Sequence, residues 1–143
     1  MIRTIAVVAC CAALAACGPG PSAPPADNEP VQRVVTFAPH LAEIMFEVGA
    51  GNQLVGVSAW SDYPRAVLEL PEVGDAFTVD QEQLSLLRPD LVLVWASGMP
   101  VHTVDDLRQR GYRVESVTTR NLADVAAAMR RVGELTGHAA VSY

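Results

Sequence analysis

The sequence predicts an α/β fold, a three-layer, doubly wound domain built on a mostly parallel sheet. Two observations carry this prediction. Strand-like and helix-like patterns alternate from residue 31 onwards, and the run Leu91–Trp95 is apolar at every position. A continuous apolar run is typical of a central parallel strand covered on both faces. Repeated strand–helix–strand units then place helices on both sides of the sheet.

Four short segments are expected to be strands because they are rich in β-branched or apolar residues and end at turn residues. They are residues 33–37, 54–58, 91–95 and 113–117. The last of the four is the most polar, so we expect it nearer the edge of the sheet.

Four helices are expected between and after these strands. The first begins at Pro39, where the missing N–H of proline costs nothing, and ends at residues 49–51. The second is capped by Asp80 and stopped by Pro89, the third is closed by Gly111, and the fourth is capped by Asn121. Apolar side chains recur at helical spacing in each helix, and of these Leu84 and Leu87 are expected to face inward. They are Leu41, Ile44, Met45 and Val48, then Leu84 and Leu87, then Val101, Val104 and Leu107, then Leu122, Val125, Met129 and Val132.

The first 30 residues are expected to lie outside the fold. Residues 1–16 combine a positive start with an apolar run too short to span a bilayer, which is typical of a secretory signal. The run ends at Cys17 in a pattern that resembles a bacterial lipobox; the alternative is an ordinary signal peptide that contains cysteines. Residues 17–30 are rich in proline and predict an extended tether. All three cysteines lie at or before position 17, so no disulfide is expected in the folded part.

In parallel sheets, ligands bind beyond the carboxyl ends of the strands. The loops expected there contain Pro39 and His40 after the first strand, Trp60 and Tyr63 after the second, and Trp95 after the third. Aromatic rings at strand ends offer a broad apolar surface suited to a bulky ligand. The alternative is that Trp60 and Trp95 only cover the core.

Several motifs, in order, resemble those of vitamin B12-binding proteins of the helical-backbone class of periplasmic binding proteins. They include Arg33-Val34-Val35-Thr36-Phe37-Ala38-Pro39 with Glu43, Ser61-Asp62-Tyr63-Pro64, Pro71-Glu72-Val73-Gly74, and Arg88-Pro89-Asp90-Leu91. The resemblance covers residues 33 to 138. It implies a substrate-binding protein of an ABC importer, with cobalamin as the ligand and a permease and ATPase as partners. Haem and ferric-siderophore binders share this scaffold and stay open as alternatives.

The resemblance also implies roles for individual residues. Trp60 and Trp95 match aromatic positions that contact the corrinoid, and Phe77 stands beside Ala76, where the family carries another ligand-facing aromatic. Pro39, His40 and Tyr63 complete the predicted ligand-binding set. Glu82 matches a carboxylate that docks on the permease; the alternative is a solvated residue in the first turn of a helix, where the dipole favours glutamate. His40 has two alternatives, a polar loop residue or a ligand for a corrin or haem metal.

Other classes of function are disfavoured by the composition and the motifs. We find no cysteine nucleophile in the expected fold, no nucleophile elbow and no phosphate-binding glycine loop, so we expect no enzyme activity. The net charge of −6 disfavours nucleic-acid binding. His102 and His138 have no partners at metal-ligand spacing, so no metal site and no required cofactor are expected.

The family resemblance implies two lobes joined by a long helix. Residues 31–120 correspond to an N-terminal lobe, and residues 121–143 to the start of the inter-lobe helix, running through His138, with the second lobe absent. One reading is therefore a truncated transport receptor, and the other a one-lobe interaction module that binds no ligand. A lipid anchor at Cys17 would hold either on the periplasmic or outer cell-envelope face, at the outer membrane in a Gram-negative cell.

Overall fold

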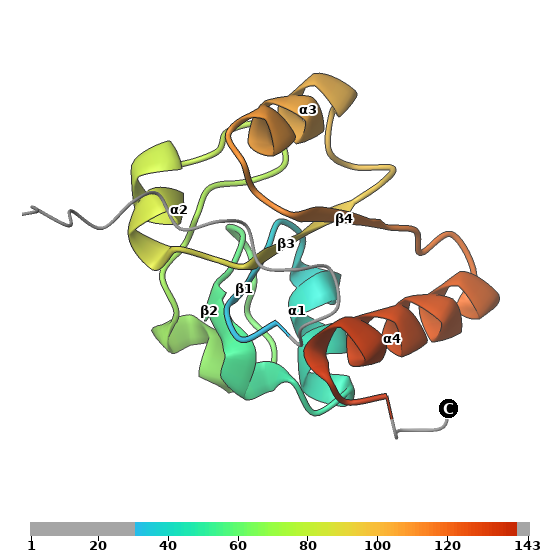
Figure 1. Cartoon of the computed structure of the whole chain (residues 1–143). Coiled ribbons are helices and arrows are strands. Elements are labelled where there is room, and N and C mark those ends of the chain that lie inside the picture. The colour runs from blue at the N-terminus through green and yellow to red at the C-terminus, as the bar shows by residue number, and fades with distance from the viewer. Residues whose placement is uncertain (1–30, 140–143) are drawn as a thin grey trace, which may run out of the picture.

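The computed structural model describes residues 31–139, and one parallel sheet lies at its centre (Figure 1). The strands are β1 (Val34–Thr36), β2 (Leu54–Gly56), β3 (Leu91–Trp95) and β4 (Val114–Val117), in the order β2-β1-β3-β4. The helices are α1 (Pro39–Glu47), α2 (Gln81–Leu87), α3 (Val101–Gln109) and α4 (Leu122–Thr136), with short 3₁₀ turns at Gly51–Gln53 and Arg65–Glu69. The polar strand β4 lies at the sheet edge, as its composition predicted.

Helices cover both faces of the sheet, so the predicted three-layer α/β class is confirmed. Alternate residues of β1 and β3 point to opposite faces. Val34, Leu91 and Leu93 belong to one core with α1 and α4, whereas Val35, Val92 and Val94 belong to a second core with α2 and α3. In Figure 1, α2 and α3 lie on one side of the strands and α1 and α4 on the other.

Local sequence signals explain where three of the helices begin. Pro39 occupies the first turn of α1. The Asp80 carboxylate accepts a hydrogen bond from the Gln83 N–H at 2.9 Å, and the Asn121 side chain accepts one from the Asp124 N–H at 2.9 Å. These are the caps that the sequence predicted, because such side chains satisfy N–H groups that lack helical partners.

The end of α4 differs from the prediction that this helix runs through His138. Gly137 adopts a φ of +78°, and the His138 N–H donates to the Gly133 carbonyl at 2.6 Å. The Gly137 N–H also donates to the Glu134 carbonyl at 3.3 Å. This is a Schellman termination, which glycine favours because it carries no Cβ. The helix therefore ends at Thr136, and the assignment of residues 121–143 to an inter-lobe connector stays a prediction.

Two of the apolar residues at helical spacing are exposed rather than buried. Val101 is 75% exposed and Leu122 is 88% exposed. Each is the first residue of its helix, ahead of the residues that the helix buries. The buried stripe of α4 lies further along the helix, at Ala128, Val132 and Leu135.

The predicted signal, Cys17 and the tether at residues 17–30 lie outside the described residues. Within residues 31–139, no helix is both long and apolar enough to cross a membrane.

We expect Thr36→Val to stabilise the fold. Thr36 is fully buried in β1, and its hydroxyl has no hydrogen-bond partner. Replacing an unsatisfied buried hydroxyl with a methyl group of similar size should raise the free energy of unfolding by about 1 kcal/mol. Urea denaturation followed by circular dichroism measures the change.

Thr136→Val is the matched control, because Thr136 is also buried but its hydroxyl donates to the Val132 carbonyl at 2.8 Å. This variant should lose stability or leave it unchanged. A lower unfolding midpoint for Thr36→Val than for the native chain would contradict the expectation.

Candidate ligand-binding site

Because all four strands run in the same direction, their carboxyl ends meet at one edge of the sheet. A hollow of about 280 Å³ opens there, and we call it the aromatic hollow. Four of the six predicted ligand-binding residues line it: Pro39, Trp60, Phe77 and Trp95. The remaining lining residues are Phe37, Ala38, Ser58, Ala59, Asp75 and Ala76.

Trp60 is held at the rim of this hollow by an unusual backbone conformation. Its φ is +67°, in the left-handed region, and its side chain is 84% exposed. The left-handed conformation costs a residue with a Cβ about 1–2 kcal/mol. Because the Trp60 side chain is exposed, its packing offsets little of this cost. Strained backbone conformations of this kind cluster at functional sites.

Phe77 is positioned by a tight loop that the sequence analysis did not identify. The Asp75 carboxylate accepts hydrogen bonds from the backbone N–H groups of Phe77 at 2.8 Å and Thr78 at 2.7 Å. The turn begins at Gly74, whose φ is +98° and where a Cβ would meet the Thr78 carbonyl oxygen. The spacing of Asp75 from Phe77 and Thr78 is that of an Asx turn, so the sequence did contain a signal for it.

Trp95 lies between a glycine and a histidine. A Cβ on Gly98 would come within 2.0 Å of the Trp95 indole, so the ring rests directly on the Gly98 backbone. The His40 ring meets the indole edge-on, with a centroid distance of 5.4 Å and an interplanar angle of 84°. Gly98 was not predicted as a site residue, because its contact with Trp95 depends on the ring's orientation.

A second hollow, of about 470 Å³, lies between α1 and α4, and Trp95 lines it as well. We call it the α1–α4 hollow. It is lined by His40, Glu43, Ile44, Glu47, Trp95, Thr119, Val125 and Met129. Burial lowers the pKa of His40, and the charge of Glu43 opposes this only in part. The His40 Nε2 lies 3.3 Å from the Thr119 hydroxyl.

Tyr63 and Glu82, the other two predicted functional residues, line neither hollow. Tyr63 precedes a cis bond to Pro64 and is mostly exposed. Glu82 is exposed in the first turn of α2. In residues 31–139, no three His, Cys, Asp or Glu side chains are arranged to hold a metal ion.

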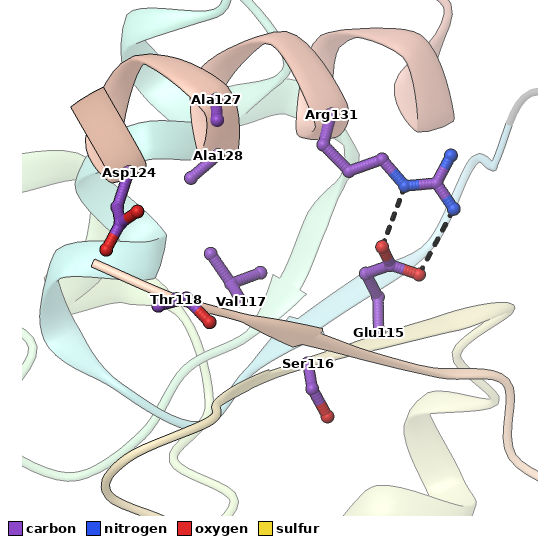
Figure 2. Close-up of a pocket in the computed structure, with 8 residues that line it drawn as sticks. All are labelled: Glu115, Ser116, Val117, Thr118, Asp124, Ala127, Ala128 and Arg131. Atoms are coloured by element: carbon purple, nitrogen blue, oxygen red, sulfur yellow. Dashed lines mark hydrogen bonds and ion pairs between the residues drawn. The ribbon is translucent and has the colours of Figure 1, made fainter. Parts of the chain in front are cut away.

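A third hollow, of about 190 Å³, lies between β4 and α4, away from the aromatic rings (Figure 2). At one side of it, the Arg131 guanidinium reaches from α4 to β4 and donates to both Glu115 oxygens, at 2.7 and 3.3 Å. This hydrogen bond raises the pKa of Arg131. The pair joins the edge strand to the helix, so we assign it to the fold and not to the ligand site.

The family model described as periplasmic binding protein matches residues 34–141. The chain belongs to the periplasmic binding protein family. This confirms the class that the motifs at Pro39, Tyr63 and Pro89 indicated.

Relatives of this periplasmic binding protein include two named vitamin B12-binding proteins. The protein of Vibrio parahaemolyticus is 40% identical over 99 residues, which are 69% of this chain and 36% of the relative. The protein of Pectobacterium carotovorum is 34% identical over 107 residues, 75% of this chain and 39% of the relative. The chain therefore spans less than two fifths of the length of these curated relatives.

Solved structures show the same fold. The periplasmic vitamin B12 binding protein BtuF of Vibrio cholerae superposes with a TM-score of 0.69 at 35% identity, over 78% of this chain and 42% of that one. A periplasmic heme binding protein from Pseudomonas aeruginosa superposes with a TM-score of 0.68 at 27% identity, over 76% and 40%. The structures that share this fold thus include proteins named for vitamin B12 and proteins named for heme.

We expect Gly98→Ala to displace the Trp95 indole, because the new Cβ would occupy the space of the ring. In a Trp60→Phe background Trp95 is the only tryptophan, so its fluorescence reports the change. The emission maximum should shift to the red as the ring becomes more exposed. Ser97→Ala, a change in the same loop, is the control and should leave the emission unchanged. An emission spectrum of Gly98→Ala identical to that of its Trp60→Phe parent would contradict the contact between the Trp95 indole and the Gly98 backbone.

Proposed function

We propose that this protein is the substrate-binding component of an ABC importer and that it binds cobalamin or a related corrinoid. The single observation that carries the proposal is the aromatic hollow. The connection between β2 and α2 brings Trp60 and Phe77 to one edge of the sheet, and the end of β3 brings Trp95 there. The names of the relatives support a corrinoid as the ligand.

The chemistry of the hollow suits a large, flat, mostly apolar ligand. Aromatic faces bury much area at little cost in side-chain entropy, since each has only two rotatable bonds. Two of the rings protrude into solvent, Trp60 at 84% and Phe77 at 77% exposure, so a ligand can cover them without first displacing a packed core. In this proposal Pro39 supports the floor, and His40 and Tyr63 lie at the margins.

The proposal includes a permease and an ATPase as partners, with Glu82 as a docking contact. A carboxylate exposed on the first turn of α2 is free to meet an arginine of a partner. Such a charge mainly steers association, so its effect should weaken with salt. Glu82→Gln should slow association with the reconstituted permease at low salt; an unchanged rate would remove Glu82 from this role.

We further propose that residues 1–16 are a signal peptide and that lipidation of Cys17 anchors the protein on the periplasmic face of a membrane, in a Gram-negative cell the outer membrane. Two acyl chains suffice for stable anchoring. Mass spectrometry of the membrane-extracted protein should find a diacyl modification on the peptide that begins at Cys17. An unmodified N-terminus at another residue would contradict it.

Haem is the second candidate ligand, and His40 is the observation that favours it. This side chain lines the α1–α4 hollow beside Trp95, and its lowered pKa keeps the imidazole neutral, as metal ligation requires. The heme binding protein of Pseudomonas aeruginosa shares the fold. Haemin binding that shifts the Soret band and is lost in His40→Ala would favour this alternative.

The test of the main proposal is a titration of the chain from residue 17 with cyanocobalamin and with haemin. Trp60 and Trp95 are the only tryptophans, so a ligand on the aromatic hollow should quench most of the fluorescence. Trp60→Ala and Trp95→Ala should each weaken cyanocobalamin binding by about tenfold or more. Equilibrium dialysis gives the same constants without an optical correction.

Leu68→Ala is the matched control, because Leu68 is also an exposed apolar residue but lines neither hollow. It should bind cyanocobalamin as the native chain does. Tight haemin binding with no response to cyanocobalamin would overturn the ligand assignment. Binding that survives both tryptophan substitutions would overturn the aromatic hollow as the site.

A further inference from the structure

Trp95 lies between the aromatic hollow and the α1–α4 hollow and lines both of them. Its side chain is 36% exposed, against 84% for Trp60. An indole between two open hollows can turn toward either one, so its neighbours set the face that it offers to a ligand. The Gly98 backbone lies against one part of the ring, and the His40 ring meets the indole edge-on.

The order of the strands places His40 and Thr119 on either side of Trp95. Strand β3 lies between β1 and β4, and Trp95 is its last residue. His40 is in the first turn of α1, which follows β1, and Thr119 is in the loop that follows β4. The His40 Nε2 lies 3.3 Å from the Thr119 hydroxyl. The pair therefore bridges the end of β3, beside the Trp95 indole.

The His40 ring needs a partner to hold one orientation. The backbone of α1 fixes the Cα atom of His40, but the torsion that turns an imidazole ring has broad minima. A hydroxyl can donate and accept, so Thr119 can pair with Nε2 in either neutral tautomer of the ring. This hydrogen bond favours the ring plane that meets Trp95 edge-on.

The surroundings of His40 favour the neutral imidazole. Burial lowers the pKa of His40, and the charge of Glu43 opposes this only in part. Glu47 lines the same hollow from α1. On the α4 side, the carboxylate nearest to Thr119 in sequence is that of Asp124, which pairs with Arg120 at 3.1 Å. The loop from β3 to α3 carries no charged side chain. A neutral ring can pack against the indole without the cost of burying a charge.

We propose that Thr119 is a positioning residue of the ligand site: its hydroxyl orients the His40 ring, and this ring holds the Trp95 indole in the orientation that a ligand meets. The role rests on the proposed function, in which Trp95 contacts a corrinoid. It connects Thr119, which does not line the aromatic hollow, to ligand binding, and it gives His40 a role other than metal ligation.

The fluorescence of Trp95 tests the contact with His40 without a ligand. In a Trp60→Phe background Trp95 is the only tryptophan, and a protonated imidazole in contact with an indole quenches its emission. The emission should fall as the pH is lowered, with a midpoint below 6.5, the ordinary pKa of histidine, because burial lowers the pKa of His40. In His40→Ala this transition should be absent.

Thr119→Val removes the hydroxyl from a side chain of similar size, and it should lose most of the pH-dependent quenching. Thr119→Ser keeps the hydroxyl and should keep the quenching. Thr118→Val is the matched control, because Thr118 lines the third hollow and neither of the two hollows that Trp95 lines. It should be quenched as its Trp60→Phe parent is. Circular dichroism checks the folding of each variant, and Thr119→Ala replaces Thr119→Val if that variant does not fold.

The same substitutions in the chain from residue 17, with both tryptophans present, test the role in binding. Equilibrium dialysis with cyanocobalamin should give about fivefold weaker binding for Thr119→Val, comparable to the loss of one aromatic contact. Thr119→Ser and Thr118→Val should bind as the native chain does.

The outcomes separate this inference from the function on which it rests. If the native chain binds cyanocobalamin and Thr119→Val binds it equally well, the positioning role is overturned and the proposed function stands. If the Trp60→Phe chain shows no pH-dependent quenching, the contact between His40 and Trp95 is overturned, whatever the chain binds. If the quenching is as expected but the native chain does not bind cyanocobalamin, the proposed function fails, and the role of Thr119 in ligand binding fails with it.

Discussion

The shared direction of the four strands is the constraint on which the remaining structure depends. In a parallel sheet every loop that follows a strand emerges at the same edge, so residues far apart in sequence become neighbours there. Pro39 and Trp60 follow β1 and β2, Trp95 ends β3, and the three line one hollow for this reason. The two cores hold β1 and β3 in place, because both strands contribute buried residues to each of them.

The aromatic rings depend on small or polar neighbours for their placement. Trp95 needs Gly98 beneath it, and Phe77 needs the turn that Gly74 and Asp75 form. A rigid scaffold with a few precisely held loops is what a binding surface requires, since rings that are already in place lose little freedom when a ligand arrives.

Much of the fold could be predicted from the sequence because its signals are local. Each signal affects only the residues next to it in the sequence. Examples are the apolar run of β3, the proline at the start of α1, and the caps Asp80 and Asn121. Helical spacing alone did not indicate which of the apolar helix residues are exposed, as Val101 and Leu122 are. Three features depend on three-dimensional contacts, so the sequence could not indicate them. They are the positive φ of Trp60, the contact of the Trp95 ring with the Gly98 backbone, and the α1–α4 hollow. Tyr63 matched a motif but lines neither hollow.

The left-handed backbone of Trp60 has a consequence for how this protein can evolve. Glycine or asparagine suits that conformation better than tryptophan does, so either substitution at position 60 should help folding. An aromatic ring persists there only while something selects for it. In a lineage that no longer uses the site, position 60 should be among the first to drift, well before the buried residues of β1 and β3. Its identity can therefore serve as a marker of whether a descendant gene is still under selection for binding.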